Sequence, residues 1–482
     1  MLAGASSALA FPFALDGAPL LDFAPREVLI LVGAAFLYRQ RQAFTAGVGF
    51  FSVLIFWLVQ TMHRYGGVAL WQAIPALGLL VAYCAGYWAI TPVLARLAQR
   101  FLHPFFAFAA AVLTVDWLRG WVIGAFPWGE WSWALVRDLP FAQAAAVVGS
   151  HGMTALIALA GAALVDWRRR RRSSLAVAIL IIGVHIAGAF RLASPLTGTE
   201  TLRVAVVQGN VSQDVKNADL NNATSIRERY ARGTDKAVAA GAKLVVWPET
   251  SWPGRPHPEA EIFPFAAQAE LLIGVVTLVL DANGDGRVTN SVFAVEPNGH
   301  VTGRYAKQIL VPFGEYVPLV ASLGITKFVK TLGALEAGTS TAPVGVAKAG
   351  VLVCYDGILP WIAREEVANG ARFLTNQTND AWYDATSGPY QHRDLYTLRA
   401  IENDRWLVRA TNTGISAIID PHGRTIQSTA LETEAVITAD IGLRDTRTIY
   451  NCTGDVVMHL SLASVALGSG LALGRRLSRG RN

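Results

Sequence analysis

The sequence has 482 residues, of which 52% are hydrophobic and 16% are charged, whereas an ordinary soluble domain is about 25% charged. This composition excludes a purely soluble protein and indicates that part of the chain lies in lipid. The formal net charge is +6, but four short arginine clusters account for it, and the rest of the chain is more acidic than basic. A nucleic-acid partner is therefore not indicated.

The first 194 residues consist mostly of apolar runs separated by short polar links. A bilayer core of about 30 Å requires roughly 20 apolar residues per helix, and on this measure we expect about eight spans. They lie at about residues 2–15, 20–37, 43–60, 69–93, 104–122, 141–165, 174–193 and 455–474. The first run could instead be the core of a signal peptide, but it lacks a basic leading segment and a clear cleavage site, so we interpret it as a short span.

The arginine clusters predict the orientation of these spans, because Lys and Arg stay on the cytoplasmic side of short loops. Eight alternating helices place all four clusters on that side: Arg39 and Arg41, Arg96 and Arg100, Arg168 to Arg172, and Arg475, Arg476, Arg479 and Arg481. The region after residue 193 is then expected outside the cytoplasm. Near an expected outer boundary, Trp128, Trp131 and Trp133 are interpreted as interfacial anchors, with a lipid access path as the alternative.

Residues 200–450 have the pattern of an α/β domain. Buried-strand patterns at 202–210 and 242–250 flank a polar helical stretch, which predicts a βαβ unit. Further strands and helical stretches are expected at 271–280, 290–307, 350–354, 361–369, 372–376, 390–403 and 406–412. We therefore predict a transmembrane bundle over 1–195, a layered α/β sandwich over 200–450, and a C-terminal transmembrane helix with a basic tail over 455–482.

Three of the expected strands end in residues that can carry chemistry: Glu249 in VVWPETSWP, Lys307 in GRYAKQILVPFGEYVP and Cys354 in GVLVCYD. Taken singly, they would ordinarily be a solvated loop carboxylate, a surface lysine and a small buried thiol. Taken together they form a nucleophilic set, because a carboxylate can accept the thiol proton while an ammonium stabilises the thiolate. The lysine and the backbone amide of Tyr355 could also stabilise an oxyanion during acyl transfer.

These residues resemble a known family. The segments WPET, YAKQILVPFGEYVP and CYD resemble the Glu-Lys-Cys triad of the nitrilase, or carbon–nitrogen hydrolase, superfamily. The segments TNDAWY, GPYQHRDLYTLRAIEN and RATNTGISAIIDPHG, together with the apolar spans, are similar to its membrane-embedded members, the apolipoprotein N-acyltransferases. FWLVQTMHRYGG and WLRGWVIGAFPWGEWSW in the apolar half extend the resemblance over nearly the whole chain.

The resemblance implies a multi-pass enzyme of the bacterial inner membrane, with a nitrilase-like catalytic domain on the periplasmic side. It implies transfer of an acyl chain from a membrane phospholipid, through a cysteine thioester, to the α-amino group of a diacylglyceryl-cysteine apolipoprotein. This reaction is the last step of bacterial lipoprotein maturation. Carried over by position, the catalytic residues are Glu249, Lys307 and Cys354.

The resemblance also implies supporting roles for Glu315, Tyr355 and Asp356, and a substrate-binding role for Trp382. One position departs from the family, which usually has Cys-Tyr-Glu where this chain has Asp356. The aspartate arm reaches about 1.5 Å less far, which puts its supporting role in doubt. The alternatives are a diverged paralogue, or a membrane-anchored nitrilase-type amidase that uses water or another amine as acceptor.

Other signals receive ordinary interpretations. We expect no cofactor and no metal, because the nine histidines show no ligand spacing and neither Cys84 nor Cys452 has a partner motif. Residues 281–290 mimic the start of a calcium loop, but their strand flanks favour a hairpin turn. From 316 to 342, apolar residues at one helical spacing predict either packing against the domain or an amphipathic lid on the bilayer.

Overall fold

The computed structural model describes residues 1–482 except 16–17, 20–25, 40–41, 123–125, 197–199, 214, 216–221, 281–285, 313, 317–334 and 480–482. The chain divides into two compact units. One unit, called here the helical unit, comprises Met1–His63, Val68–Ser194 and Thr453–Asn482. The other, the sandwich unit, comprises Arg64–Gly67 and Pro195–Cys452.

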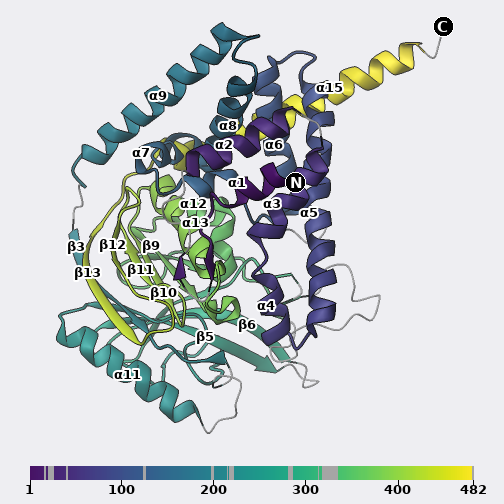
Figure 1. Cartoon of the computed structure of the whole chain (residues 1–482). Coiled ribbons are helices and arrows are strands. Elements are labelled where there is room, and N and C mark those ends of the chain that lie inside the picture. The colour runs from purple at the N-terminus through teal and green to yellow at the C-terminus, as the bar shows by residue number, and fades with distance from the viewer. Residues whose placement is uncertain are drawn as a thin grey trace. The chain divides into compact units, whose positions relative to one another are not determined.

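The helical unit is built from helices joined by short links (Figure 1). Its helices are α1 Leu2–Ala8, α2 Arg26–Tyr38, α3 Ala43–Leu54, α4 Leu58–Arg64, α5 Leu70–Ala98, α6 Pro104–Trp121, α7 Leu139–Ala142, α8 Ala145–Val165, α9 Arg171–Ala193 and α15 Val456–Arg479.

The expected count of about eight spans is not confirmed. Among the described residues, four helices are long and apolar enough to cross a membrane: α5, α8, α9 and the Val456–Leu473 part of α15. A fifth span results if α3 and α4, bent by 53°, are taken as one. The first expected span is the least supported, because α1 has seven residues, a length of about 10 Å. Of the expected span at 20–37, residues 20–25 lie outside the described part of the chain.

The apolar helices differ in how much of their surface the protein covers. In α8, 67% of the apolar window is buried inside the unit, whereas in α9 only 11% is buried. Along α9, Ile179, Ile182 and Phe190 are exposed. An outward-facing apolar surface of this extent is unfavourable in water and fits contact with lipid.

The three tryptophans expected at the membrane interface are placed differently. Trp128, Trp131 and Trp133 are each at most 2% exposed, and Trp128 packs against both Trp57 and Trp133, with ring centroids 5.2 and 5.9 Å apart. Headgroup anchors must reach the interface, so the anchoring interpretation is wrong for these side chains. They form part of the interior of the helical unit, where large rings fill volume between helices.

The sandwich unit contains two β-sheets. The six-stranded sheet has the order β13-β3-β4-β5-β6-β7, and the five-stranded sheet has the order β12-β11-β10-β9-β8. The strands are β3 Glu200–Gln208, β4 Leu244–Val246, β5 Glu270–Leu280, β6 Gly286–Val295, β7 Val301–Ala306, β8 Ala349–Val353, β9 Phe373–Thr378, β10 Leu407–Thr411, β11 Ala417–Ile419, β12 Thr425–Ser428 and β13 Ala435–Leu443.

The two sheets pack face to face, and helices cover their outer faces. A single hydrophobic cluster joins Val204 and Val246 of the first sheet to Val351 and Val408 of the second. On the outer face of the six-stranded sheet lies α11, Ala223–Ala239, while α12, Pro360–Ala368, and α13, Gly388–Asn403, pack against the five-stranded sheet (Figure 1). The predicted layered α/β sandwich is therefore confirmed.

Local sequence patterns explain most of these elements. Helix α11 buries residues spaced three and four apart, from Ile226 through Tyr230 to Ala237, which is one helical face. In the chain, α11 lies between strands β3 and β4, which pair in parallel, as the βαβ pattern predicts. Strands β5 and β6 pair antiparallel up to Leu280 opposite Gly286, so the calcium-like segment joins a hairpin, although residues 281–285 lie outside the described chain.

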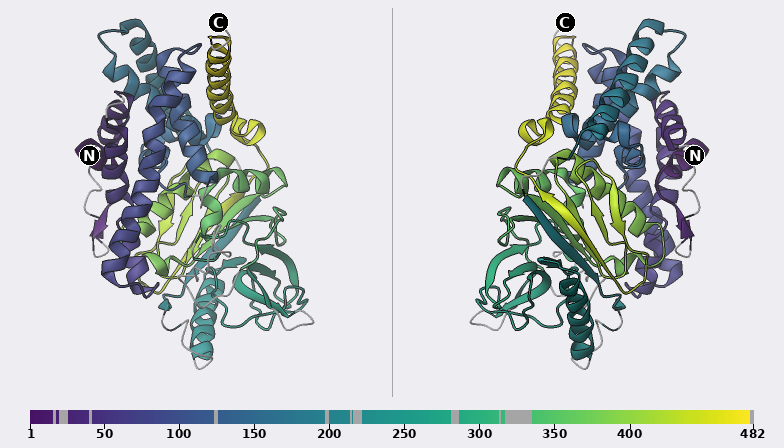
Figure 2. Two further views of the ribbon diagram at one scale, coloured as in Figure 1. Left: turned by 90° about the vertical axis from the view of Figure 1, so that its right-hand side faces the viewer. Right: turned by 90° about the vertical axis from the view of Figure 1, so that its left-hand side faces the viewer.

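Strand β13 was not expected from the sequence. It pairs antiparallel with β3 over nine residues, from Ala435 opposite Gln208 to Leu443 opposite Glu200, and Figure 2 shows it in yellow beside the teal β3. This pairing brings together segments more than 200 residues apart in the chain. The short strands β11 and β12 were also not expected.

Candidate active site

Glu249 follows β4 on a turn that needs a glycine on the neighbouring strand. The backbone amides of Ser251 and Trp252 both donate to the carbonyl of Gly274, over 2.9 and 3.1 Å. A Cβ at Gly274 would lie 2.1 Å from the carbonyl oxygen of Pro248 and 2.7 Å from the Glu249 Cα. The small residue in the LLIGVV strand thus lets the two segments meet and sets the position of the carboxylate.

Both carboxylate oxygens of Glu249 accept hydrogen bonds, although the side chain is buried. Asn290 Nδ2 donates to Oε1 over 2.6 Å, and the backbone amide of Asn379 donates to Oε2 over 2.7 Å. The two donors come from different sheets, β6 and the end of β9. Glu249 is therefore fixed in place while it remains an acceptor for one more proton.

Lys307 follows β7, and both its backbone amide and its backbone carbonyl are hydrogen-bonded. Its amide donates to the Asn290 carbonyl over 2.8 Å, and its carbonyl accepts from the Gly338 amide over 2.8 Å. The side chain is 1% exposed, and its Nζ lies 2.8 Å from Glu315 Oε1 and 3.5 Å from Glu249 Oε1. The ammonium thus lies between two carboxylates.

The charge of Lys307 is secured by these neighbours. Burial by itself would lower its pKa, but the negative charges that Cys354, Glu315 and Glu249 can carry outweigh burial and raise the pKa well above its usual value. Glu315 is held in turn by the Val311 amide, which donates to Oε2 over 2.8 Å. Lys307 is therefore a permanent cation that can stabilise a developing anion without first taking up a proton.

Cys354 follows β8 at the first residue of a short 3-10 helix, Cys354–Ile358. Its φ is +46°, a left-handed backbone conformation that costs roughly 1–2 kcal/mol for a residue with a Cβ. Tyr396 holds this turn, because its hydroxyl donates to the Cys354 carbonyl and accepts from the Gly357 amide over 3.0 Å. A Cβ at Gly357 would lie 2.1 Å from the Tyr396 ring.

The thiol of Cys354 rests in its protonated form. Burial raises its pKa, and the nearby carboxylate of Glu249 raises it further, while the Lys307 ammonium acts in the opposite direction. A thiol in this environment can act as a nucleophile only if a nearby base takes its proton. The backbone amide of Tyr355, which directly follows Cys354, lies in the first turn of the 3-10 helix.

Asp356 accepts four hydrogen bonds in a fully buried position. Its Oδ1 accepts from the backbone amides of Gln308 and Ile309, over 3.1 and 2.7 Å. Its Oδ2 accepts from the Tyr305 hydroxyl and the Val353 amide, over 2.9 and 3.0 Å. The shorter arm of aspartate therefore reaches the chain directly, without a bridging group.

These bonds connect the cysteine turn to the lysine segment. The partners of Asp356 include the two residues that follow Lys307, so the carboxylate fixes the chain on which the ammonium stands. Burial raises the pKa of Asp356 to about 6, and the Lys307 charge and the hydrogen bonds oppose this rise. Asp356 is thus a positioning residue, and it does not form an ion pair with Lys307.

The structure brings Glu249, Lys307, Glu315, Cys354 and Asp356 together, although they come from three separate parts of the sandwich unit. Trp382 lies on the adjacent short helix η4, Asp380–Tyr383. Its ring is partly exposed and packs edge-on against Tyr65, with centroids 5.6 Å apart.

Sequence reasoning missed several residues that hold this group, among them Asn290, Asn379, Tyr305 and Tyr396. Asn379 stands in the segment TNDAWY and follows a predicted strand, which is a signal for a polar strand end. The other three gave no such signal, because their partners are 39 to 51 residues away in the chain.

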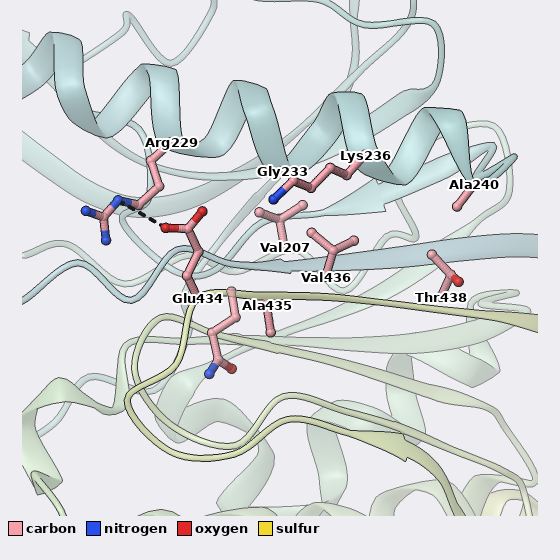
Figure 3. A pocket seen from close by; sticks show the side chains of 10 residues that line it. Val207, Arg229, Gly233, Lys236, Ala240, Glu434, Ala435, Val436 and Thr438 are labelled. Carbon is pink, nitrogen blue, oxygen red and sulfur yellow. Dashed lines mark ion pairs between the residues drawn. The ribbon is translucent and has the colours of Figure 1, made fainter.

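Among the hollows in the described part of the sandwich unit, one of about 320 Å³ lies between α11 and β13 and is lined by Arg229, Lys236 and Glu434 among others (Figure 3). It contains none of the candidate site residues. Another, of about 330 Å³, is lined by Arg64 and Tyr65 and, around η4, by Asp380, Ala381 and Asp384. This second hollow adjoins the segment that binds Glu249.

Within the described ranges, no group of three or more His, Cys, Asp or Glu side chains could hold a metal ion. The site brings together a buried thiol, a buried carboxylate and a fixed cation at the strand ends of an α/β sandwich. It defines an enzyme of the carbon–nitrogen hydrolase class, and residues 203–451 match the family model described as carbon-nitrogen hydrolase.

Residues 3–163 match a second family model, the apolipoprotein N-acyltransferase N-terminal domain. Apolipoprotein N-acyltransferase of Geobacter metallireducens is 32% identical over 99% of this chain and 95% of its own length. The relatives of that name from Gloeobacter violaceus and Bradyrhizobium diazoefficiens are each 34% identical, over 88% and 99% of this chain and 84% and 94% of their own lengths. The chain belongs to the apolipoprotein N-acyltransferase family and is an acyltransferase.

Proposed function

We propose that this protein transfers an acyl chain from a membrane phospholipid to the α-amino group of diacylglyceryl-cysteine apolipoproteins, through a thioester on Cys354. The observation that carries the proposal is the placement of the Lys307 ammonium, 3.5 Å from Glu249 and 2.8 Å from Glu315, in the buried group that includes the thiol. This arrangement suits acyl transfer, because it supplies a nucleophile, a base and an oxyanion partner at one point.

In the first half-reaction, Glu249 takes the proton of the Cys354 thiol as Sγ attacks the ester carbonyl of the phospholipid. The carbonyl oxygen becomes an oxyanion, which the Lys307 ammonium and the Tyr355 amide stabilise. When the intermediate collapses, the ester C–O bond breaks and the departing alkoxide takes the proton from Glu249. The products are an acyl thioester on Cys354 and a lysophospholipid.

In the second half-reaction, the α-amino group of the apolipoprotein attacks the thioester carbonyl. Glu249 accepts a proton from the attacking nitrogen, and the same two donors stabilise the second oxyanion. The C–S bond then breaks, an amide forms, and the departing thiolate takes the proton back from Glu249. The enzyme returns to its starting state without any cofactor.

Several residues have supporting roles in this proposal. Glu315 and Asp356 hold Lys307 and its segment in place, Glu315 through its ion pair with the ammonium and Asp356 through its bonds to the amides of Gln308 and Ile309. Trp382 is proposed to contact substrate, because it lies between Ala381 and Asp384, which line the 330 Å³ hollow beside the site. That hollow is polar, which suits the hydrophilic part of a lipid or lipopeptide substrate.

We further propose that the regions 1–195 and 455–482 lie in the bacterial inner membrane and that 200–450 lies on the periplasmic side. The four arginine clusters support this orientation, and so do the outward-facing apolar side chains of α9. Reporter fusions after residues 40, 98, 170 and 480 should report cytoplasm, and a fusion near 200 should report periplasm. An inversion at any one of these points would break the eight-span arrangement.

The proposed reaction is tested with purified enzyme in detergent and a phospholipid carrying labelled acyl chains. Mass spectrometry should find the acyl adduct on the Cys354 peptide, and the adduct should disappear when a diacylglyceryl lipopeptide is added. Cys354→Ala should abolish the adduct, whereas Cys452→Ala, which removes an exposed thiol, should leave it unchanged. Release of free fatty acid at the same rate with and without lipopeptide would support the amidase-like alternative instead.

A further inference from the structure

Next to the Cys354 turn lies a charged cluster that the mechanism above does not use. Asp380, His392 and Arg409 are each at most 1% exposed. Asp380 Oδ2 accepts from Arg409 Nη2 over 2.6 Å, and Asp380 Oδ1 lies 2.9 Å from His392 Nδ1. A buried ion pair gives little net stability, because desolvation offsets the attraction. Stability alone therefore does not explain why this ion pair lies beside Cys354, and we ask which group it holds in position.

The cluster is tied to the cysteine turn through Tyr396. The Arg409 guanidinium lies 5.2 Å from the centroid of the Tyr396 ring, and the ring of His392 lies 5.4 Å from the same ring. Tyr396 in turn bonds to the Cys354 carbonyl. The positions of the cluster and of the nucleophile are therefore set together.

Thr378 connects the cluster to the reacting sulfur. The parallel pairing of β8 and β9 ends with Val353 opposite Gln377, and this pair is followed by Cys354, just after β8, and by Thr378, the last residue of β9. The Thr378 hydroxyl donates to Asp380 Oδ1 over 3.0 Å. Burial is the largest influence on the Cys354 thiol and raises its pKa, whereas a hydrogen bond with the Thr378 side chain lowers it.

The Thr378 hydroxyl thus has two acceptors within reach and one proton to donate. Asp380 can lose this hydrogen bond, because His392 and Arg409 still satisfy its carboxylate. We propose that Thr378 is a catalytic residue whose hydroxyl turns from Asp380 to the Cys354 sulfur as the thiol ionises, and that Asp380, held by Arg409 and His392, positions it. This inference rests on the proposed role of Cys354 as the nucleophile.

The proposed step leaves every covalent bond of threonine intact. The S–H bond of Cys354 breaks, its proton passes to Glu249, and the O–H group of Thr378 only exchanges one acceptor for another. The thiolate then has two stabilising partners, the Lys307 ammonium and the Thr378 hydroxyl. Hydrogen bonds to charged groups are the stronger ones in proteins, so loss of the hydroxyl should affect the thiolate more than the resting thiol.

The test measures ionisation of the thiol without any lipid substrate. Iodoacetamide is added to the full-length enzyme at pH values from 6 to 11, and mass spectrometry follows alkylation of the Cys354 peptide. Thr378→Val removes the hydroxyl and keeps the shape of the side chain, whereas Thr378→Ser keeps the hydroxyl. Thr375→Val is the matched control, because Thr375 is fully buried on the same strand and its hydroxyl bonds to Gln377 instead.

For Thr378→Val we expect the alkylation rate at pH 7.5 to fall about tenfold, the change that corresponds to a rise of about one unit in the pKa of the thiol. Thr378→Ser should remain within threefold of the unchanged enzyme, and Thr375→Val should not differ from it. If Thr378→Val does not fold, Thr378→Ala is compared with Thr375→Ala in the same way. Equal alkylation profiles for the variants at 378 and at 375 would overturn the inference.

The result does not depend on the acyl donor. If the threonine dependence of alkylation is found but no acyl adduct forms from phospholipid, the proposed function fails and the inference about Thr378 survives. If the adduct forms at the same rate in Thr378→Val and Thr375→Val, and their alkylation profiles also agree, the proposed function survives and Thr378 is only a structural residue.

Discussion

The two sheets of the sandwich unit contribute unlike halves of the candidate site. The six-stranded side supplies the charges, Glu249 after β4 and Lys307 after β7. The five-stranded side supplies a neutral thiol at the end of β8, held by hydroxyl and amide groups. Because Glu249 and Cys354 stand on different sheets, the distance between the sheets sets how far the carboxylate lies from the thiol.

Two sets of hydrogen bonds keep that distance. The Asn379 amide, at the end of β9, donates to Glu249, and Asp356 of the cysteine turn accepts from Gln308 and Ile309 of the lysine segment. The first set connects the five-stranded sheet to the segment that carries Glu249. The second connects the cysteine turn to the segment that carries Lys307. The half that carries Glu249 and Lys307 and the half that carries the thiol should therefore respond differently to substitution, and the connections should show intermediate effects.

The largest effect is expected on the charged half, at Glu249. Glu249→Gln keeps the shape and removes the base, so formation of the acyl-enzyme should fall by about 10²- to 10⁴-fold. The adduct on Cys354 is measured by mass spectrometry in single-turnover experiments with phospholipid. Glu259→Gln, at an exposed position of the same connecting segment, should leave the rate unchanged. Similar rates for both variants would show that another group takes the proton.

Lys307 is expected to affect both rate and stability. Lys307→Met should lower acyl-enzyme formation by about 10²- to 10³-fold, as loss of an oxyanion partner does. It should also destabilise the fold by about 3–5 kcal/mol, because two buried carboxylates lose their common counter-ion. Thermal unfolding followed by tryptophan fluorescence measures the second effect. The exposed Lys243→Met is the control, and a normal unfolding temperature for Lys307→Met would contradict the ion-pair assignment.

Asp356 tests the connection between the two halves. Asp356→Asn replaces an oxygen acceptor with an NH₂ group facing backbone donors, and we expect a loss of about 10- to 100-fold in acyl-enzyme formation. Asp356→Glu places an extra methylene in a fully buried position, so we expect a loss of about tenfold. Recovery of full activity in Asp356→Glu would instead show that the site accommodates the usual family residue.

The raised pKa of Asp356 predicts that the rate of acyl-enzyme formation depends on pH. Since the pKa of Asp356 is raised to about 6, the carboxylate gains a proton as pH falls through 6 and can no longer accept from all four donors. The rate of acyl-enzyme formation should therefore decline below about pH 6. In Asp356→Asn the rate should be low and nearly independent of pH over that range. A decline of the same size in both proteins would assign it to another group.

The smallest effect on activity is expected at Glu366 of α12, which is buried behind the cysteine turn. Burial, followed by the charge of Asp356, raises its pKa from 4.5 to about 9. The folded protein then binds one more proton than the unfolded chain between these pH values, so this residue makes stability fall as pH rises.

Glu366→Gln should remove that dependence and leave the reaction rate nearly unchanged. Relative to the unchanged protein, we expect Glu366→Gln to gain about 1–4 kcal/mol of stability between pH 5.5 and 8.5. Thermal unfolding at several pH values measures the gain. Glu365→Gln, at the exposed neighbouring position, should show no such gain, and parallel curves for all three proteins would contradict a raised Glu366 pKa.

Local pattern in the sequence determined much of the sandwich unit. Runs such as LRVAVVQ and GVLVC predict strands. Successive side chains of a strand point to opposite faces of the sheet, so a short apolar run indicates a strand that is buried on both faces. The positions of Glu249, Lys307 and Cys354 after strands were also predictable, whereas their catalytic roles stay a prediction. Over residues 316–342, either packing against the domain or a lid on the bilayer was predicted; because residues 317–334 lie outside the described part of the chain, the choice between them stays open.

Tertiary structure alone decided which partners these residues meet. Asn290 and Asn379 contact Glu249 across 41 and 130 residues of chain, and β13 joins β3 across more than 200. Composition also could not distinguish α8 from α9, which are both apolar, yet one is mostly covered by protein and the other is not. The reason is physical: periodicity reports the environment of each segment, whereas pairing, burial between helices and the distances within a site depend on contacts that no local window contains.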